Sequence, residues 1–192
     1  LILLIGFFSD TEKKISPSIR LILQTLVILV TIQFFDITIN ATGYVLLDLI
    51  LNNSILSILF TAFCILILVN GTNFIDGTNL NTIGYYFVLS IILFKLDNFE
   101  NFFLLNFEIY NFIIILALIL ILNLFNKIYL GDSGSYLLGF IFGFELINFY
   151  NQNTVSPFYI ILLLWYPCFE MLFSIFRKLN FKRSPLKPDS KH

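Results

Sequence analysis

Residues 54–69, SILSILFTAFCILILV, carry no charged side chain and run directly into Asn70-Gly-Thr-Asn-Phe-Ile-Asp-Gly-Thr-Asn, a polar stretch that ends at residue 79. Only helices and closed barrels satisfy every backbone hydrogen bond in lipid, and barrel strands alternate with a period of two. The apolar run is continuous, so it predicts a membrane helix. The polar stretch predicts a loop at the membrane boundary.

The same alternation of apolar runs and polar breaks extends over the whole chain. It predicts an all-α, polytopic helical membrane protein with six complete transmembrane helices and part of a seventh, a single domain over residues 1–192. The apolar start without an initiator Met and the basic, Pro-containing end lead us to expect a fragment, incomplete at both ends. The predicted spans are Leu1–Phe8 (partial), Ile19–Phe35, Ser54–Val69, Thr82–Lys95, Phe107–Phe125, Tyr136–Phe149 and Phe158–Phe176.

The composition agrees with a chain that lies in lipid. Hydrophobic residues make up 58% of it and charged residues only 12%, about half of what a soluble domain carries. A net charge of −1 gives no basic field for nucleic acid. Cys64 and Cys168 lie inside apolar runs without metal-ligand spacing, and we interpret both as small hydrophobic residues.

Positive charge separates the loops into two sets. If the spans alternate in direction, one set of loops with its helix ends holds ten cations and the other holds only Lys95. Lys and Arg accumulate on the cytoplasmic side of membrane proteins, so the first set is predicted to be cytoplasmic. Its cations are Lys13, Lys14, Arg20, Lys127, Arg177, Lys178, Lys182, Arg183, Lys187 and Lys191.

Three aspartates stand out in the predicted cytoplasmic loops. Asp10 follows the first apolar run, Asp76 lies in the polar stretch described above, and Asp132 lies in Leu130-Gly-Asp-Ser-Gly-Ser. Small residues let backbone N–H groups approach an anion, and carboxylates hold a hard cation, so the set predicts a site for magnesium and a phosphate substrate. The alternative for each residue alone is a helix cap, Asp132 capping the span that starts near Tyr136. Glu145 and Glu170, within predicted spans, are expected to make interhelical hydrogen bonds.

Four motifs in this order carry a resemblance to a known family. They are the Gly6-Phe-Phe-Ser-Asp junction, Asn73-Phe-Ile-Asp-Gly, Gly131-Asp-Ser-Gly-Ser and the tail Arg183-Ser-Pro-Leu-Lys-Pro-Asp-Ser-Lys-His. Together they resemble the cytoplasmic motifs of the polyprenyl-phosphate N-acetylhexosamine-1-phosphate transferases, glycosyltransferase family 4. That family includes the phospho-MurNAc-pentapeptide translocase and the enzymes that start O-antigen and teichoic acid synthesis.

The resemblance implies an activity and a set of roles. The enzyme would move a sugar-1-phosphate from a UDP-sugar to polyprenyl phosphate and release UMP, at the cytoplasmic face of a bacterial cytoplasmic membrane, as the first membrane step of an envelope polysaccharide. Magnesium, or manganese, would be its cofactor. Asp10, Asp76 and Asp132 would be catalytic, with Asp76 and Asp132 at the metal. The implied substrate-binding residues are Asn73, Asp76, Arg183 and His192.

Two positions depart from the family pattern. Ser9 stands where the family usually has the first of two acidic residues, unless Glu12 substitutes for it, and Leu80 stands where a glycine is common. These departures leave a catalytically inactive relative as an alternative. A transporter is the other alternative, although its charges would be expected near the middle of the bilayer. The sugar and the oligomeric state, monomer or homodimer, stay open.

Overall fold

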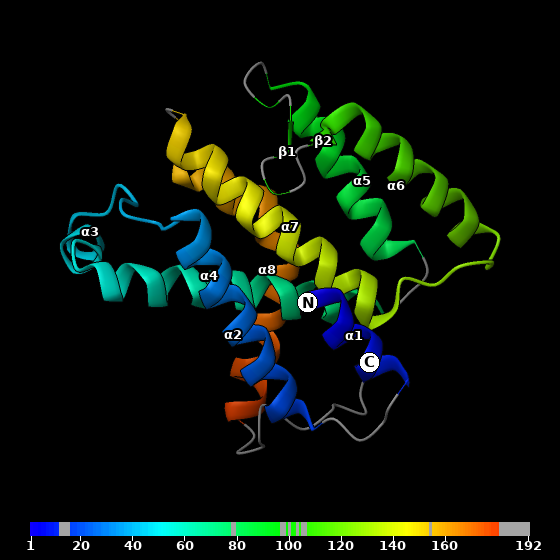
Figure 1. Cartoon of the computed structure of the whole chain (residues 1–192), viewed down its shortest axis with the longest axis horizontal. Helices are drawn as coiled ribbons and strands as arrows, with labels where there is room; N and C mark the ends of the chain where they lie inside the picture. The colour runs from blue at the N-terminus through cyan, green and yellow to red at the C-terminus, as the bar shows by residue number, and fades with distance from the viewer. Residues whose placement is uncertain are drawn as a thin grey trace.

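The structure is a computed structural model that describes residues 1–11, 16–77, 80–96, 99, 101–102, 104, 107–153 and 155–180. Within these residues the chain forms eight helices and one short antiparallel hairpin (Figure 1). This confirms the predicted all-α class. In order, the elements are α1 (Ile2–Thr11), α2 (Pro17–Phe35), α3 (Val45–Leu51), α4 (Ser54–Ile75), α5 (Asn81–Phe94), β1 (Asn101–Phe102), β2 (Phe107–Glu108), α6 (Ile109–Leu124), α7 (Gly131–Gln152) and α8 (Pro157–Asn180).

Helix starts follow from local sequence signals. Ser16 caps α2 by accepting a hydrogen bond from the Ile19 amide, and Pro17 occupies the first turn, where its missing N–H costs nothing. Asn53 caps α4 by accepting from two backbone amides of the first turn. The boundary between the short helix α3 and the long helix α4 is therefore set by one polar side chain.

Helix α7 is the centre of the bundle, and glycines let its neighbours approach it. It crosses α4 at Gly139, where an added Cβ would lie 2.8 Å from the Thr72 hydroxyl oxygen. One group of buried side chains joins α7 to α5 and α6, through Tyr86 and Phe142 among others, and a second joins it to α1, α2 and α4. Because both groups share α7, the position of its first turn is fixed from both sides.

Two predicted loop boundaries were wrong. Helix α4 continues to Ile75, six residues past the predicted end of its span, so Asn73 lies on a helix and not in a loop. Helix α7 begins at Gly131 instead of Tyr136, so Asp132 lies in its first turn. In both cases the helix extends through polar residues, because their side chains make hydrogen bonds within the protein at this end of the bundle.

The structure also contains elements that the apolar pattern did not predict. Helix α3 lies in the predicted loop between the second and third apolar runs, and the hairpin precedes α6, which begins at Ile109 instead of Phe107. Glu145, buried in α7, accepts a hydrogen bond from the Leu104 amide at 2.7 Å. Glu145 was expected to make an interhelical hydrogen bond. The bond described here instead joins it to the backbone of a loop.

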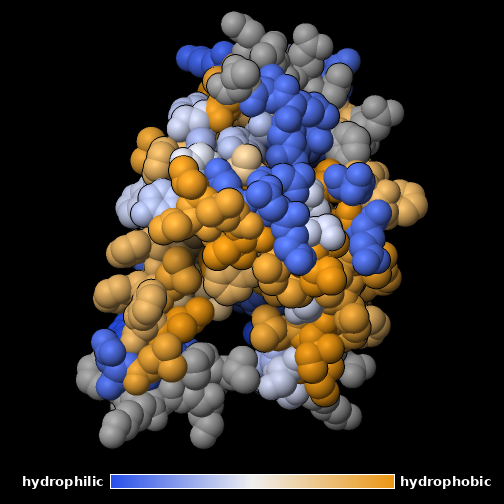
Figure 2. Space-filling model, turned by 90° about the vertical axis from the view of Figure 1, so that its left-hand side faces the viewer, coloured by the Kyte–Doolittle hydropathy of each residue, from blue (hydrophilic) through white to orange (hydrophobic). Residues whose placement is uncertain are grey.

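Three helices are both long and apolar enough to cross a membrane, namely α2, α4 and α8. Helices α1, α5 and α6 are apolar but shorter, with 10 to 16 residues. The chain is therefore a membrane protein of several spans, whereas six complete spans remain a prediction. On the face shown in Figure 2, hydrophobic side chains form a broad continuous area between polar side chains. Helices α2 and α8 expose Leu26, Phe34, Trp165, Phe169 and Phe173, as expected for a surface in contact with lipid.

The loops gather at two opposite ends of the bundle, as the alternation of spans predicted. In Figure 1 the end of α1, the starts of α5 and α7 and the end of α6 lie toward the lower right, and the opposite ends of α5, α6 and α7 lie toward the top and upper left. At that second end, the Asn151 amide donates to the Thr38 carbonyl and the Tyr150 hydroxyl donates to the Ala41 carbonyl. The predicted site residues that the structure describes all lie at the first end.

Candidate functional site

The site begins with a close crossing of α1 over the first turn of α7. A Cβ at Gly6 would overlap the backbone of Ser133, so glycine is required for the two helices to approach this closely. The crossing is followed by Ser9 and Asp10 on the next turn of α1. It therefore places both side chains against the start of α7.

Asp10 caps α7 from a different helix. Its Oδ1 accepts from the Asp132 amide at 3.0 Å, and its Oδ2 accepts from the Ser133 amide at 3.2 Å and the Ser133 hydroxyl at 2.8 Å. A carboxylate is stabilised there because the free amides and the helix dipole both present positive charge. Gly131, with φ of 62°, leaves room for this carboxylate. Asp10 is thus placed to hold the site together, in agreement with a positioning role.

Because Asp10 supplies the cap, the side chain of Asp132 is free to face the other helices. Its Oδ1 accepts from the Asn73 amide group at 2.6 Å, and its Oδ2 accepts from the Ser9 hydroxyl at 2.6 Å. Asn73 also donates to the Ser135 hydroxyl at 3.1 Å. The alternative in which Asp132 caps its own helix is therefore wrong. Three of the four motif segments meet at this one carboxylate.

Arg20 is a member of this cluster that the sequence analysis counted only among the topology-setting cations. Its Nη1 lies 3.0 Å from Asp132 Oδ2 and 2.9 Å from the Ser9 hydroxyl oxygen. Its guanidinium carbon lies 5.7 Å from the centre of the Tyr136 ring, within cation–π range. The sequence gives no spacing signal for this role, since a cation at the start of a membrane helix is expected for topology alone.

Asp76 follows the last turn of α4 and carries the perturbed carboxyl group of the site. Burial raises the pKa of Asp76 to about 6, the Thr82 hydroxyl opposes that shift, and the negative charges of Asp132 and Asp10 add to it. These charges act on Asp76 because the three carboxylates share one end of the bundle. Asp76 therefore lies within electrostatic reach of Asp132 and Asp10 at the same end of the bundle.

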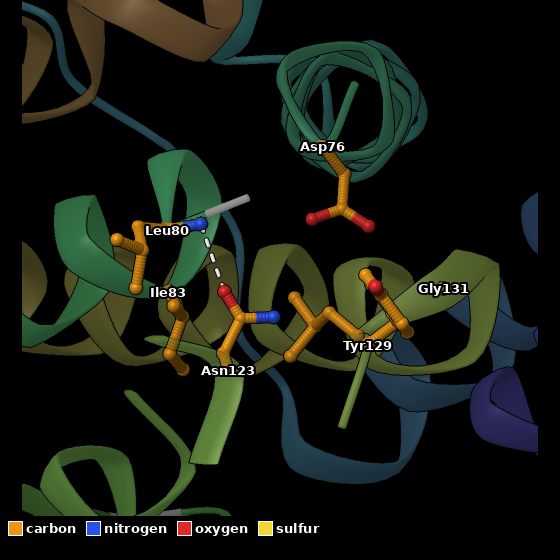
Figure 3. Close-up of a pocket in the computed structure, with 7 residues that line it drawn as sticks. Asp76, Leu80, Ile83, Asn123, Tyr129 and Gly131 are labelled. Atoms are coloured by element: carbon orange, nitrogen blue, oxygen red, sulfur yellow. Dashed lines mark hydrogen bonds between the residues drawn. The ribbon is translucent and has the colours of Figure 1, made fainter. Parts of the chain in front are cut away.

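A pocket of about 160 Å³ lies beside Asp76. Figure 3 shows the Asp76 carboxylate pointing from α4 toward Asn123 and Gly131 on the other side of the pocket. The lining residues are Asp76, Leu80, Ile83, Asn123, Tyr129, Leu130 and Gly131. The pocket therefore joins the segment after α4 to the segment that leads into Asp132.

Leu80 takes the backbone conformation that a glycine would favour at this position. Its φ is 69°, in the left-handed region, which costs a non-glycine residue about 1–2 kcal/mol. Its amide donates to Asn123 Oδ1 at 2.8 Å, the bond drawn in Figure 3. The chain thus keeps a glycine-like turn at the departure from the family pattern, and the leucine side chain adds an apolar wall to the pocket.

Asn123 joins two walls of the pocket, and we expect its loss to loosen them. It is buried, accepts from the Leu80 amide and donates to the Ile128 carbonyl at 2.8 Å. Asn123→Leu should leave both backbone groups without a partner, at a cost of about 1–3 kcal/mol for each. The expected result is a lower melting temperature in detergent, measured by differential scanning fluorimetry. Asn111→Leu, at a half-buried position in the first turn of α6 where the side chain bonds the exposed Glu108 carboxylate and, among the described residues, no backbone group, serves as the control; equal melting temperatures for the two variants would contradict the bridging role.

The donor set of the site fits a divalent cation that arrives with a phosphate substrate. Among the described residues, no three His, Cys, Asp or Glu side chains are close enough to form a metal cage. Magnesium, however, is usually held by one or two carboxylates, with substrate phosphate oxygens and water completing its shell. Asp76 and Asp132 are the two carboxylates predicted for that role, and the charge of Asp132 contributes to the raised pKa of Asp76. The Asp10 carboxylate instead faces the first turn of α7, where it accepts hydrogen bonds from the Asp132 amide and the Ser133 hydroxyl.

Four of the predicted site residues lie at this end of the bundle. Asn73, Asp10, Asp76 and Asp132 lie together, as described above. Arg183, His192 and Glu12 lie outside the described residues. The contribution of the basic tail to substrate binding therefore stays a prediction.

Comparisons with known proteins identify the family of the chain. The profile of the family described as glycosyl transferase family 4 matches residues 1–150, which contain every described residue of the site. A segment of 66 residues is 38% identical to the undecaprenyl-phosphate alpha-N-acetylglucosaminyl 1-phosphate transferase of Thermotoga maritima. That match covers 34% of this chain and only 22% of the relative. No solved structure matches the chain. The family profile spans more than half of the chain, and the chain therefore belongs to glycosyl transferase family 4.

Proposed function

We propose that the protein transfers an N-acetylhexosamine-1-phosphate from a UDP-sugar to a polyprenyl phosphate, releasing UMP. A phosphate oxygen of the lipid attacks the β-phosphorus of the UDP-sugar, a new P–O bond forms, and the bond to UMP breaks. The observation that carries this proposal is the meeting of Asp132, Asn73 and Ser9 from three separate motifs, with Asp76 nearby, beside a pocket at one end of an apolar bundle. A lipid phosphate and a sugar-nucleotide can both reach such a place.

In this proposal two residues bind the metal ion and two others fix the position of Asp132. Asp76 and Asp132 would hold a magnesium or manganese ion, which offsets negative charge on the diphosphate when bound. Asp10 and Asn73 fix Asp132, by capping its helix and by bonding its Oδ1. No protein base is required, because the second pKa of a phosphate monoester is about 6 and the acceptor is largely ionised at pH 7. We infer a positioning role for Asp10 and a substrate role for Asn73 and Asp76.

The membrane setting supports the choice of a lipid acceptor. Exposed apolar side chains cover α2 and α8, so a polyprenyl chain could lie beside the helices with its phosphate at the boundary. The excess of Lys and Arg in the same set of loops supports a cytoplasmic location of the site. By its family we propose a bacterial cytoplasmic membrane and a role at the start of envelope polysaccharide synthesis. Arg183 and His192 are proposed to bind the sugar-nucleotide.

Membranes that contain the full-length protein are expected to convert polyprenyl phosphate and a radiolabelled UDP-N-acetylhexosamine into a lipid-linked sugar diphosphate when magnesium is added. EDTA should remove the activity and excess magnesium should restore it. The product is measured by extraction into organic solvent and thin-layer chromatography, with membranes lacking the protein as control. If none of the common UDP-sugars gives a lipid product, the protein is an inactive relative; substrate flux without phosphate transfer would indicate a transporter.

A further inference from the structure

Ser9 changes how the cluster around Asp132 is charged. At 2.6 Å from Asp132 Oδ2, the Ser9 hydroxyl donates a hydrogen bond that a carboxylate at this position could not donate. Two carboxylates at that separation would repel each other and attract a cation. With serine, the cluster holds one negative charge fewer.

Arg20 already places a positive charge beside the Asp132 carboxylate. Its Nη1 is within hydrogen-bond distance of both Asp132 Oδ2 and the Ser9 oxygen, so Ser9 donates to Asp132 and accepts from Arg20. The remaining Asp132 oxygen accepts from Asn73. Oδ2 therefore already accepts from two donors before any metal binds, and a cation that binds Asp132 through Oδ2 has to displace one of them.

We propose that Arg20 and the divalent cation compete for Asp132, and that Ser9 holds Arg20 in place in the substrate-free protein. Arg20 is then a positioning residue that keeps Asp132 occupied until cation and diphosphate arrive together. A guanidinium displaced from Asp132 stays beside the metal and can donate to a phosphate oxygen. The inference rests on the proposed function, because it takes the metal at Asp132 from that proposal.

The test measures Mn²⁺ affinity of the purified full-length protein in detergent, by electron paramagnetic resonance of the free ion and without any sugar-nucleotide. Arg20→Gln should bind Mn²⁺ about tenfold more tightly than the wild type, because a unit positive charge within a few ångströms of the metal is removed. Ser9→Asp should also bind more tightly, by about tenfold, because it adds a negative charge at the same place. Arg20→Lys, which keeps the charge, should stay close to the wild type.

Lys127→Gln is the matched control, since Lys127 is an exposed cation at the same end of the bundle. Its affinity should change less than about twofold, because an exposed charge is screened by solvent. If Arg20→Gln lowers the melting temperature and leaves Mn²⁺ affinity unchanged, Arg20 is only a structural tie and the inference is overturned. An equal gain in Lys127→Gln and Arg20→Gln would also overturn it, because the effect would then be one of net charge.

Failure of this inference can be told apart from failure of the proposed function. A wild type that transfers sugar phosphate, together with unchanged Mn²⁺ affinity in Arg20→Gln and Ser9→Asp, refutes the competition and leaves the function intact. Tighter Mn²⁺ binding in both variants, together with no lipid product from any UDP-sugar, supports the competition and refutes the transferase. The cation-induced rise in melting temperature provides a second readout, and it should be larger in Ser9→Asp than in the wild type.

Discussion

Asp132→Asn is expected to reduce sugar-phosphate transfer by about 100-fold or more, because under the proposed function it removes the charge that would hold a cation and that orients the surrounding donors. The helix around it should remain in place. The cap on α7 uses the backbone amide of residue 132, which Asp10 binds whichever side chain is present. Transfer is measured with the radiolabelled donor, and insertion is checked by the yield and melting temperature of the purified protein.

A matched control for this substitution lies at the opposite end of the bundle. Asp48, in the first turn of α3, accepts hydrogen bonds from the Thr42 amide and hydroxyl in the segment that leads into the helix. Asp48→Asn should keep nearly full activity. Full activity in Asp132→Asn would show that Asp132 is not catalytic and would also refute its proposed role as a metal ligand.

Gly6→Ala is expected to cause the second large loss, although the residue has no reactive group. The new Cβ would overlap backbone atoms of Ser133 and Asp132, and backbone cannot move aside as a flexible side chain can. Overpacking of this kind costs about 1–3 kcal/mol. A shift of about 1 Å at Ser9 and Asp10 could reduce turnover by about 100-fold. Both the melting temperature in detergent and the transfer rate should therefore fall.

Gly84→Ala is the control for this substitution, because no atom lies within 4 Å of a Cβ added there. At the end of the first turn of α5, where Gly84 lies, alanine favours the helix over glycine by up to about 1 kcal/mol. The melting temperature should stay the same or rise, with activity unchanged. Equal behaviour of the two alanine variants would show that the crossing of α1 and α7 does not depend on glycine at position 6.

The helical class and the two-sided arrangement of the loops were predictable because they depend on local pattern. In lipid a continuous apolar segment forms a helix, because a helix satisfies its backbone hydrogen bonds within the segment. Spans that alternate in direction place every second loop at the same end. Helix ends were less predictable. Residues 70–75 and 131–135 are polar and contain glycine, which is typical of loops, yet they are helical here because Asn73 and Asp132 satisfy each other across two helices.

The structure brings four of the predicted site residues together, but the sequence did not predict their partners. Asp10, Asp76, Asp132 and Asn73 could be selected as polar residues at predicted membrane boundaries. Arg20 and Asn123 could not, because a cation at a helix start and a single Asn at a helix end are common for other reasons. Their roles depend on Ser9, Asp132 and Leu80, which lie 11 to 112 residues away in the sequence.

By itself, the sequence determined that this protein is a bundle of membrane helices, and it predicted that Asp10, Asp76, Asp132 and most of the cations lie at one end. Hydrophobicity and charge act residue by residue, so they can be read without knowing which helices touch. Only the tertiary structure decided which donor meets which carboxylate: Asp10 caps α7, Asp132 holds Arg20 and Ser9, and Asp76 faces a pocket. These contacts depend on glycine crossings and side-chain distances of about 3 Å, which a one-dimensional pattern does not encode.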